Sequence, residues 1–268
     1  MKQIRQFLVV LFALTMIISC EKNENGTQDI LSVEKISAKW IIDGTSIYKS
    51  FEFNKSGNYI IVKKASTDST SKQSILFGTY EITDNKTLVL SDFGKIKISE
   101  INDKSLSFSV SLTTSPTTEV AITASKQAEI QSTTKTDLLC RTWEMLTING
   151  KTVVGTNQQL SVLFSASGTY FVSYANPTDE NDGGLAQWKW KDDSQTKLLY
   201  SWNEVPVWDE THSVEISKLT ADSLKIIENK DVYVLKPKAN IKANTKQTVK
   251  IISTSDLNNN IKTGFLKK

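Results

Sequence analysis

Two stretches of this chain are near-copies of each other: "FEFNKSGNYIIV" at residues 51–62 and "VLFSASGTYFVS" at residues 162–173. In each, two runs of apolar and aromatic residues flank a short polar segment that ends in a glycine, Gly57 or Gly168. A glycine at this place is typical of a tight β-hairpin turn, in which one residue needs a positive φ. The sequence therefore predicts the same hairpin twice, about 110 residues apart.

The similarity extends well beyond the hairpins. Trp40 and Trp143 precede them at corresponding places, and "ISEINDKSL" (98–106) matches "ISKLTADSL" (216–224) position for position. Apolar and polar residues alternate with period two, which predicts eight short strands in each half and no helix beyond a turn before each tryptophan. The chain is therefore an internal duplication of one all-β unit.

Eight sequential strands with short connections most simply form an up-and-down antiparallel barrel, which has no exposed sheet edge. We predict an all-β protein with two tandem eight-stranded up-and-down barrels, and a pair of β-sandwiches is the alternative fold. The barrels are expected at residues 30–126 and 133–238, with a polar boundary between them. Residues 239–268 form a polar tail rich in lysine and asparagine, in which "VKIIS" is a candidate extra strand for the second barrel.

The N-terminal residues have the features of a secretory signal. Two basic residues precede "FLVVLFALTMII" (7–18), an apolar run too short to span a bilayer, which needs about 20 residues. The run ends in "IISC", which resembles the lipobox of bacterial lipoproteins, with Ile17, Ser19 and Cys20 in the matching roles. A signal followed by an ordinary cysteine is the alternative.

The lipoprotein resemblance implies how the protein is anchored. Residues 1–19 would be a signal peptide, Cys20 would carry acyl chains such as palmitate, and residues 20–29 would be a linker. The expected location is the outer membrane, with the face left open. Removal of residues 1–19 takes away two basic and no acidic residues, so 32 basic residues become 30 against 29 acidic ones, a net charge of +1. This balance gives no electrostatic footprint for nucleic acid.

A second resemblance concerns the barrels themselves. A tryptophan on the first strand followed by F-x-x-x-G-x-Y is present twice, at Phe53–Tyr59 and Phe164–Tyr170. The pattern resembles the lipocalin-like domains of Bacteroidetes lipoproteins. The resemblance implies a barrel that binds a small, partly apolar ligand.

Motifs for catalysis or metal binding are absent from the sequence. It contains no G-x-S-x-G, Walker loop or H-E-x-x-H, and His212 is the only histidine. "DENDGG" (179–184) resembles the start of a calcium loop, but its twelfth position holds Trp190 in place of an acid. We therefore expect no enzyme activity, no cofactor and no bound metal.

The candidate ligand site lies in the second half. In "QWKWKDD" (187–193) the lysines share one face of a strand and the tryptophans share the other, so the aromatic rings are expected to point inward. Hairpin pairing would set Trp188 near Tyr200. Long odd-numbered connections meet at one end of the second barrel, and one of them, "NEVPVWDET" (203–211), is much longer than its counterpart "DFGK" (92–95). The predicted ligand-binding residues are Trp188, Trp190, Tyr200, Trp208, Asp209 and Glu210.

The expected function is thus a membrane-anchored, non-enzymatic envelope lipoprotein that binds a small, partly apolar ligand at the mouth of a barrel. The alternative is a structural or assembly module that docks on another envelope protein.

Overall fold

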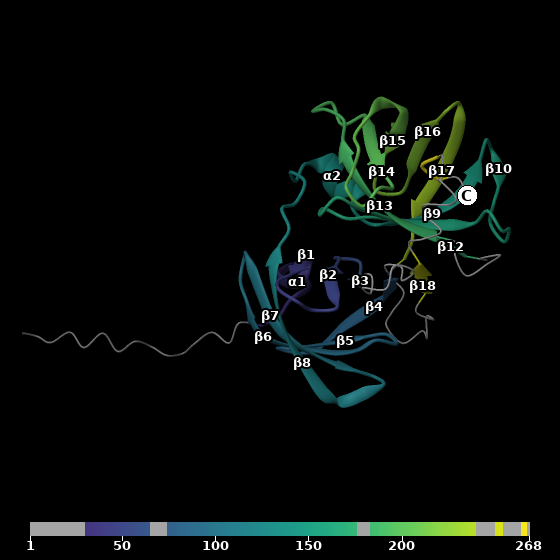
Figure 1. Cartoon of the computed structure of the whole chain (residues 1–268). Coiled ribbons are helices and arrows are strands. Elements are labelled where there is room, and N and C mark those ends of the chain that lie inside the picture. The colour runs from purple at the N-terminus through teal and green to yellow at the C-terminus, as the bar shows by residue number, and fades with distance from the viewer. Residues whose placement is uncertain (1–29, 65–73, 176–182, 240–249, 254–263, 267–268) are drawn as a thin grey trace, which may run out of the picture. The chain divides into compact units, whose positions relative to one another are not determined.

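The computed structural model describes residues 30–64, 74–175, 183–239, 250–253 and 264–266. Leu31–Lys268 forms one compact unit, in which the described residues build two closed eight-stranded antiparallel barrels (Figure 1). The predicted tandem up-and-down barrels are confirmed, and the β-sandwich alternative is excluded because the first and last strands of each half pair with each other. None of the helices in the described ranges is long and apolar enough to cross a membrane.

Each strand of the first barrel pairs with its neighbours in sequence, and β1 pairs with β8 to close the ring. The elements are α1 (Val33–Ile36), β1 (Lys39–Ile42), β2 (Tyr48–Phe53), β3 (Asn58–Lys63), β4 (Ser74–Asp84), β5 (Thr87–Leu90), β6 (Gly94–Ile101), β7 (Ser105–Leu112) and β8 (Ser115–Lys126).

The second barrel has the same order of pairing and is closed by β9 and β17. Two small additions, β10 (Lys151–Thr152) and the 3-10 turn η1 (Glu210–His212), lie in its connections. The other elements are α2 (Thr134–Leu139), β9 (Thr142–Ile148), β11 (Leu160–Phe164), β12 (Thr169–Tyr174), β13 (Gly183–Trp190), β14 (Lys197–Ser201), β15 (Ser213–Leu219), β16 (Leu224–Glu228) and β17 (Asp231–Pro237).

The repeated hairpin forms as predicted. Gly57 and Gly168 have φ values of +78° and +77°, and each donates its backbone N–H to the carbonyl three residues earlier, at Asn54 and Ser165. A residue with a Cβ is disfavoured at such a φ. The two glycines therefore fix the register of β2 with β3 and of β11 with β12.

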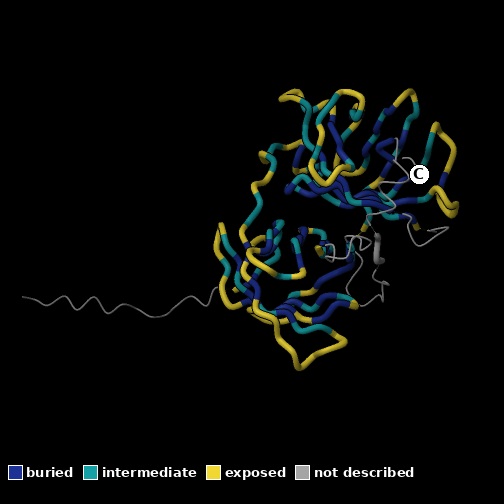
Figure 2. The backbone as a smooth tube through the Cα atoms, in the orientation of Figure 1, coloured by how far each residue is buried: buried dark blue, intermediate teal, exposed yellow. Residues whose placement is uncertain are grey.

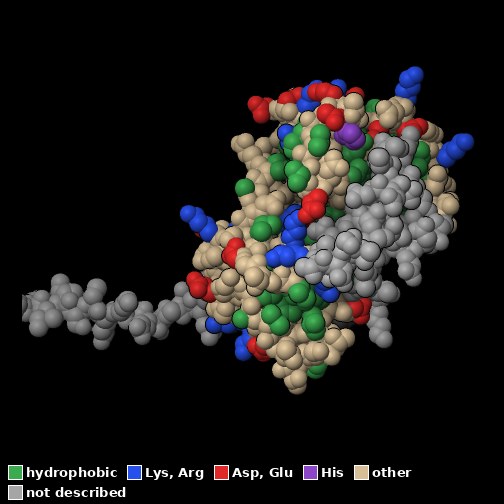
Figure 3. Space-filling view, viewed as in Figure 1, with side chains coloured by type: hydrophobic (Ala, Val, Ile, Leu, Met, Phe, Trp, Pro, Cys, Tyr) green, Lys and Arg blue, Asp and Glu red, His purple; other side chains and the backbone are tan. Residues whose placement is uncertain are grey.

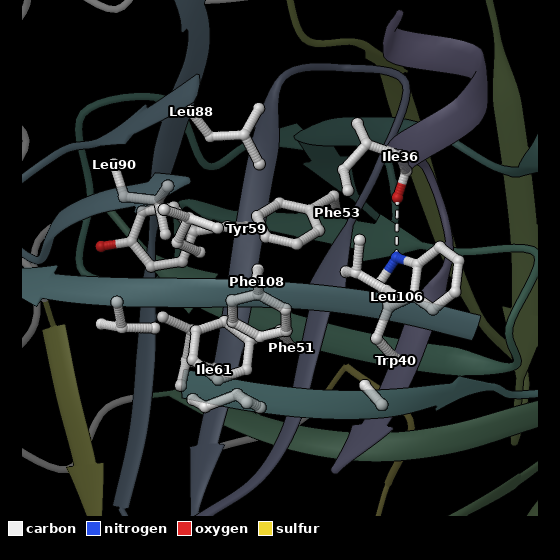
Figure 4. Packing of buried hydrophobic residues seen from close by; sticks show 14 of the residues in the cluster. Ile36, Trp40, Phe51, Phe53, Tyr59, Ile61, Leu88, Leu90, Leu106 and Phe108 are labelled. Carbon is white, nitrogen blue, oxygen red and sulfur yellow. Dashed lines mark hydrogen bonds between the residues drawn. The ribbon is translucent and has the colours of Figure 1, made fainter. Parts of the chain in front are cut away.

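The two tryptophans anchor the short helices. Trp40 and Trp143 are fully buried, and their indole N–H groups donate to the carbonyls of Ile36 and Leu139 at 3.0 and 2.9 Å. Figure 4 shows Trp40 and this hydrogen bond beside the aromatic core of the first barrel. Since a buried indole N–H needs an acceptor, each tryptophan fixes a helical turn at one end of its barrel. We call this the helix end, and the other the open end.

Buried residues follow the strands and exposed ones collect at the hairpin tips, as Figure 2 shows. In β7, Leu106, Phe108 and Val110 are buried and alternate with partly exposed serines. The period-two alternation of the sequence thus becomes an apolar interior and a polar exterior.

The C-terminal region departs from the expected polar tail at two points. A strand does form at β18 (Lys250–Ser253), but it pairs with β4 of the first barrel, and so the option of an extra strand in the second barrel is corrected. Further on, Phe265 and Leu266 are buried in the apolar core of the second barrel.

Candidate functional site

The second barrel brings together three of the six predicted ligand-binding residues, Trp188, Trp190 and Tyr200. Trp188 and Tyr200 are opposite each other in the β13–β14 pairing, as predicted, and both are almost completely buried. The Trp188 indole donates to the Ser165 carbonyl at 3.0 Å, and its ring meets Phe164 edge-on at 5.7 Å between centroids. The two side chains are therefore part of a packed core.

Trp190 lies at the helix end of the same barrel. Its ring packs edge-on against Trp188 at 5.6 Å, and its indole N–H donates to the Thr136 hydroxyl of α2 at 2.9 Å. It therefore points inward as predicted, but its contacts are to the helix and not to the connections at the open end.

The β14–β15 connection does not cover the barrel interior as predicted. It follows the outer face of β13: the Gln187 amide donates to the Glu204 carbonyl at 3.1 Å, the Lys189 ammonium lies 4.9 Å from the centre of the Trp208 ring, and Lys191 forms an ion pair with Glu210 at 2.6 Å. Gln187, Lys189 and Lys191 form the polar face of β13, and each has a partner in the β14–β15 connection. The sequence placed Trp208, Asp209 and Glu210 over the interior, and this prediction is corrected because Trp208 and Glu210 contact the outer face of β13.

Asp209 has a local structural role in this connection. Its carboxylate accepts hydrogen bonds from the backbone N–H groups of Thr211 and His212 and caps the 3-10 turn. Hydrogen bonds from the side chains of Thr211 and His212 hold the pKa of Asp209 at about 2, so it is ionised at neutral pH. His212 in turn meets the Tyr200 ring edge-on at 5.5 Å.

The space expected for a ligand in the second barrel is filled by Phe265. Its ring is stacked on Tyr170, with centroids 4.3 Å apart and planes 7° from parallel, and it lies 5.0 Å from the Tyr200 ring. The Tyr170 hydroxyl donates to the Phe265 carbonyl at 2.5 Å, and the Phe265 N–H donates to Glu228 at 2.8 Å. The same Glu228 oxygen accepts from the Tyr200 hydroxyl at 2.9 Å.

Sequence reasoning missed Phe265 and Glu228. One signal for Phe265 was the apolar pair "FL" (265–266) inside a lysine-rich segment. A second was the loss, in the longer second-copy connection, of the phenylalanine that "DFGK" supplies in the first copy.

The open end of the first barrel holds a cavity of about 750 Å³, a volume in the range of small-molecule sites. Its walls are the connection between β1 and β2, the β7–β8 hairpin and the adjoining strand ends. The apolar lining includes Ile42, Tyr48, Phe108, Val110, Val120 and Ile122. This cavity is on the first barrel, whereas the sequence pointed to the second.

Polar groups in the cavity are mostly hydroxyls. Thr45, Ser46, Thr118 and Thr123 are among them, and Asp43 alone carries a charge among the residues that line it. Burial raises the pKa of Tyr48, which therefore stays a neutral phenol at physiological pH. The arrangement suits a molecule with an apolar body and neutral hydrogen-bonding groups.

One face of the molecule shows how charged and apolar side chains are distributed over the barrels. On the face shown in Figure 3, basic and acidic side chains are interspersed, and hydrophobic side chains gather on the first barrel. Two rim residues of the cavity, Ile47 and Val120, are 64% and 49% exposed although they are large and apolar. Exposed apolar groups around a concave site are typical of binding surfaces.

The described residues include no cluster of three or more metal-binding side chains. Cys140 is partly buried beside α2, and burial, with the nearby Asp137 carboxylate, raises the pKa of its thiol to about 12. Its thiol is therefore protonated at neutral pH, and a thiol is a poor nucleophile.

Comparison with known proteins gives no family. No family model and no curated protein matches the chain. One solved structure, the DNA polymerase III β chain of Streptococcus pneumoniae, aligns over 82% of this chain and 62% of that one, with 10% identity and a TM-score of 0.16. The chain thus spans less than two thirds of that structure, and a likeness this weak carries no argument about function.

Proposed function

We propose that this chain is a lipid-anchored envelope protein that binds a small, uncharged, partly apolar molecule at the open end of its first barrel. The cavity of about 750 Å³ is the observation that carries the proposal, because it combines an apolar lining with hydroxyl groups. The second barrel, whose interior holds Phe265, is the less suitable candidate for such a molecule.

A neutral fluorescent dye tests the binding site. N-phenyl-1-naphthylamine is apolar and brightens when it leaves water, so titration into the protein should give a saturable signal. Val120→Asp places a charge on the rim of the cavity and should weaken binding about tenfold, or ~1.4 kcal/mol. Val205→Asp is the matched control, because Val205 is 80% exposed and does not line the cavity. Equal affinity in both variants would place the dye elsewhere and contradict the proposal.

The anchor is a separate part of the proposal, because Cys20 lies outside the described residues. The lipobox-like "IISC" supports it. Cys20→Ser should prevent acylation and move the protein from the membrane fraction to the soluble fraction of its own cells. A serine variant that stays with membranes after a high-salt wash would contradict lipid anchoring and would leave the dye experiment unaffected.

A second candidate function, docking on another envelope protein, has one observation in its favour. β1 pairs with β8 only as far as Ala124, and one more bond joins the Asp43 N–H to the Thr123 carbonyl. From Ser115 to Ile122, β8 has β7 on one side and no strand on the other among the described residues. A partner could add a strand to this edge.

Proline at Glu119 separates the two candidates. Glu119 has the same parity in β8 as Thr123, so its N–H faces the open side and not β7, and Glu119 does not line the cavity. Glu119→Pro would remove this edge donor while it leaves the ladder with β7 in place. Loss of a cellular complex with unchanged dye binding would favour docking, and loss of dye binding alone would favour the ligand site.

A further inference from the structure

The two barrels complete their cores at the open end in different ways. In the first, Phe93 from the β5–β6 connection packs edge-on against Tyr48 and Phe51 at 5.9 and 6.0 Å, and the Tyr59 hydroxyl donates to the Ser91 carbonyl at 2.6 Å. In the second, Tyr170 is the counterpart of Tyr59, and it donates to the carbonyl of Phe265. A segment remote in sequence thus supplies the aromatic ring that the first barrel takes from its own loop.

A buried carboxylate on β16, that of Glu228, accepts a hydrogen bond from this remote segment. The repeat aligns Leu106 with Leu224, and so the buried Glu228 corresponds to Val110. Burial of a carboxylate costs several kcal/mol unless donors satisfy it. The Phe265 N–H is one such donor, and the Tyr200 hydroxyl is another. The second barrel therefore has an acceptor for a backbone N–H where the first barrel has an aliphatic side chain.

The 264–266 segment is held by side chains and not by a β-ladder. Gly264, Phe265 and Leu266 form bends, and no strand pairing is recorded for them in the part of the chain that the structure describes. Elements without ladder bonds open at a lower free energy than the strands around them. We therefore expect this segment to open while the strands of the second barrel stay paired.

We propose that the interior of the second barrel is a recognition site for an extended peptide with a phenylalanine followed by an aliphatic residue, and that the 264–266 segment is its resident ligand. Glu228 accepts a hydrogen bond from the phenylalanine N–H, and Tyr170 donates one to its carbonyl. The phenylalanine side chain packs against the rings of Phe164, Tyr170 and Tyr200. This inference is independent of the function proposed for the first barrel.

Peptides added to a shortened chain test the site. A variant without residues 254–268 keeps β18 and all sixteen barrel strands but lacks the resident segment. The peptide TGFLK (263–267), blocked at both ends, should bind it with a saturable change in tryptophan emission, because Trp202 lies 5.6 Å from Tyr170. The full chain should bind at least tenfold more weakly, because its own segment competes.

Two control peptides isolate the contacts. TGALK lacks the ring and should not bind. TGFLK methylated at the phenylalanine nitrogen keeps the ring but removes the N–H that Glu228 accepts, and it should bind at least tenfold more weakly. Equal affinity of the methylated peptide, or equal affinity of the full and shortened chains, would overturn the proposal.

Hydrogen exchange in the intact protein covers the case in which the shortened chain does not fold. The Phe265 amide should exchange faster than the Tyr200 amide of β14, and excess TGFLK should accelerate it further. Exchange of both amides at one rate, unaffected by the peptide, would show a permanent core element and overturn the proposal. A concentration-dependent dimer of the full chain would assign the segment to a neighbouring copy and overturn its role as the chain's own ligand.

Discussion

Tyr59 and Tyr170 occupy the same position in the two copies, and their hydroxyl groups donate to different parts of the chain. Each donates to a backbone carbonyl inside its barrel, at Ser91 in the first and at Phe265 in the second. Burial raises the pKa of both tyrosines well above the ordinary value, so both remain protonated donors throughout the physiological pH range. The duplication thus kept the donor and changed its acceptor.

Replacement of Tyr59 or Tyr170 by phenylalanine should lower the free energy of unfolding by a similar amount, but only the second replacement should affect the 264–266 segment. Tyr170→Phe and Tyr59→Phe each leave a buried carbonyl without its donor, which costs about 1–3 kcal/mol in the free energy of unfolding. Urea denaturation measures this loss. Only Tyr170→Phe should also accelerate hydrogen exchange at Phe265. Faster exchange there in Tyr59→Phe would show that the segment responds to general destabilisation.

At the scale of elements, the hairpin between β11 and β12 requires a glycine for two reasons: the positive φ of Gly168 and the close approach of β13 to its Cα. A Cβ on Gly168 would lie 3.2 Å from the Trp188 carbonyl, whereas one on Gly57 would lie 3.9 Å from the Tyr80 carbonyl. Gly155, with a φ of +79°, has no heavy atom within 4 Å of the same position. The three glycines share a backbone conformation and differ in the space around them.

Alanine substitutions can separate these two contributions. Gly155→Ala should cost only the backbone term, about 1–2 kcal/mol. Gly168→Ala should cost more, because β13 must also move away from the added methyl group. Urea denaturation measures the loss. The midpoint of unfolding should fall, while the slope of the unfolding free energy against urea concentration stays the same. Equal losses in the two variants would show that the backbone conformation alone sets the cost.

The strands and the repeated hairpin could be predicted because period-two alternation and turn glycines are local signals. The inward position of Trp188 and its pairing with Tyr200 followed from the same signals. The path of residues 202–212 could not be predicted, because it depends on contacts with Lys189 and Lys191 on another strand. The cavity of the first barrel was equally hidden, since no sequence pattern reports how far side chains fill an end of a barrel.

At the scale of the whole molecule, the second barrel depends on residues outside its own strands. Its core cluster includes Phe265 and Leu266, which follow β17 by more than twenty-five residues, whereas the first barrel's cluster ends at Ala124. The boundaries drawn from the repeat, 30–126 and 133–238, enclose the strands of both barrels. Among the residues whose burial the structure describes, they enclose every member of the first barrel's core cluster but leave out two of the second barrel's.

Fragments should show this asymmetry. The fragment 30–126 should unfold cooperatively on its own. The fragment 133–238 lacks the phenylalanine side chain, whose removal from a core costs about 3–5 kcal/mol, so it should be much less stable than the fragment 133–268. Thermal melts followed by circular dichroism would compare them. Equal melting temperatures for 133–238 and 133–268 would mean that the segment adds nothing to the barrel.

The contact between Tyr170 and Phe265 joins residues 95 positions apart. Ribosomal synthesis proceeds from the N-terminus, so the strands of the second barrel are made before the ring that fills its interior. During that interval the interior of the barrel lacks the Phe265 ring, and the Glu228 carboxylate lacks one of its hydrogen-bond donors. The barrel is then in the state of a binding site without its ligand. A chain interrupted before residue 265 would keep that state, which would give cellular proteases a way to distinguish incomplete copies from finished ones.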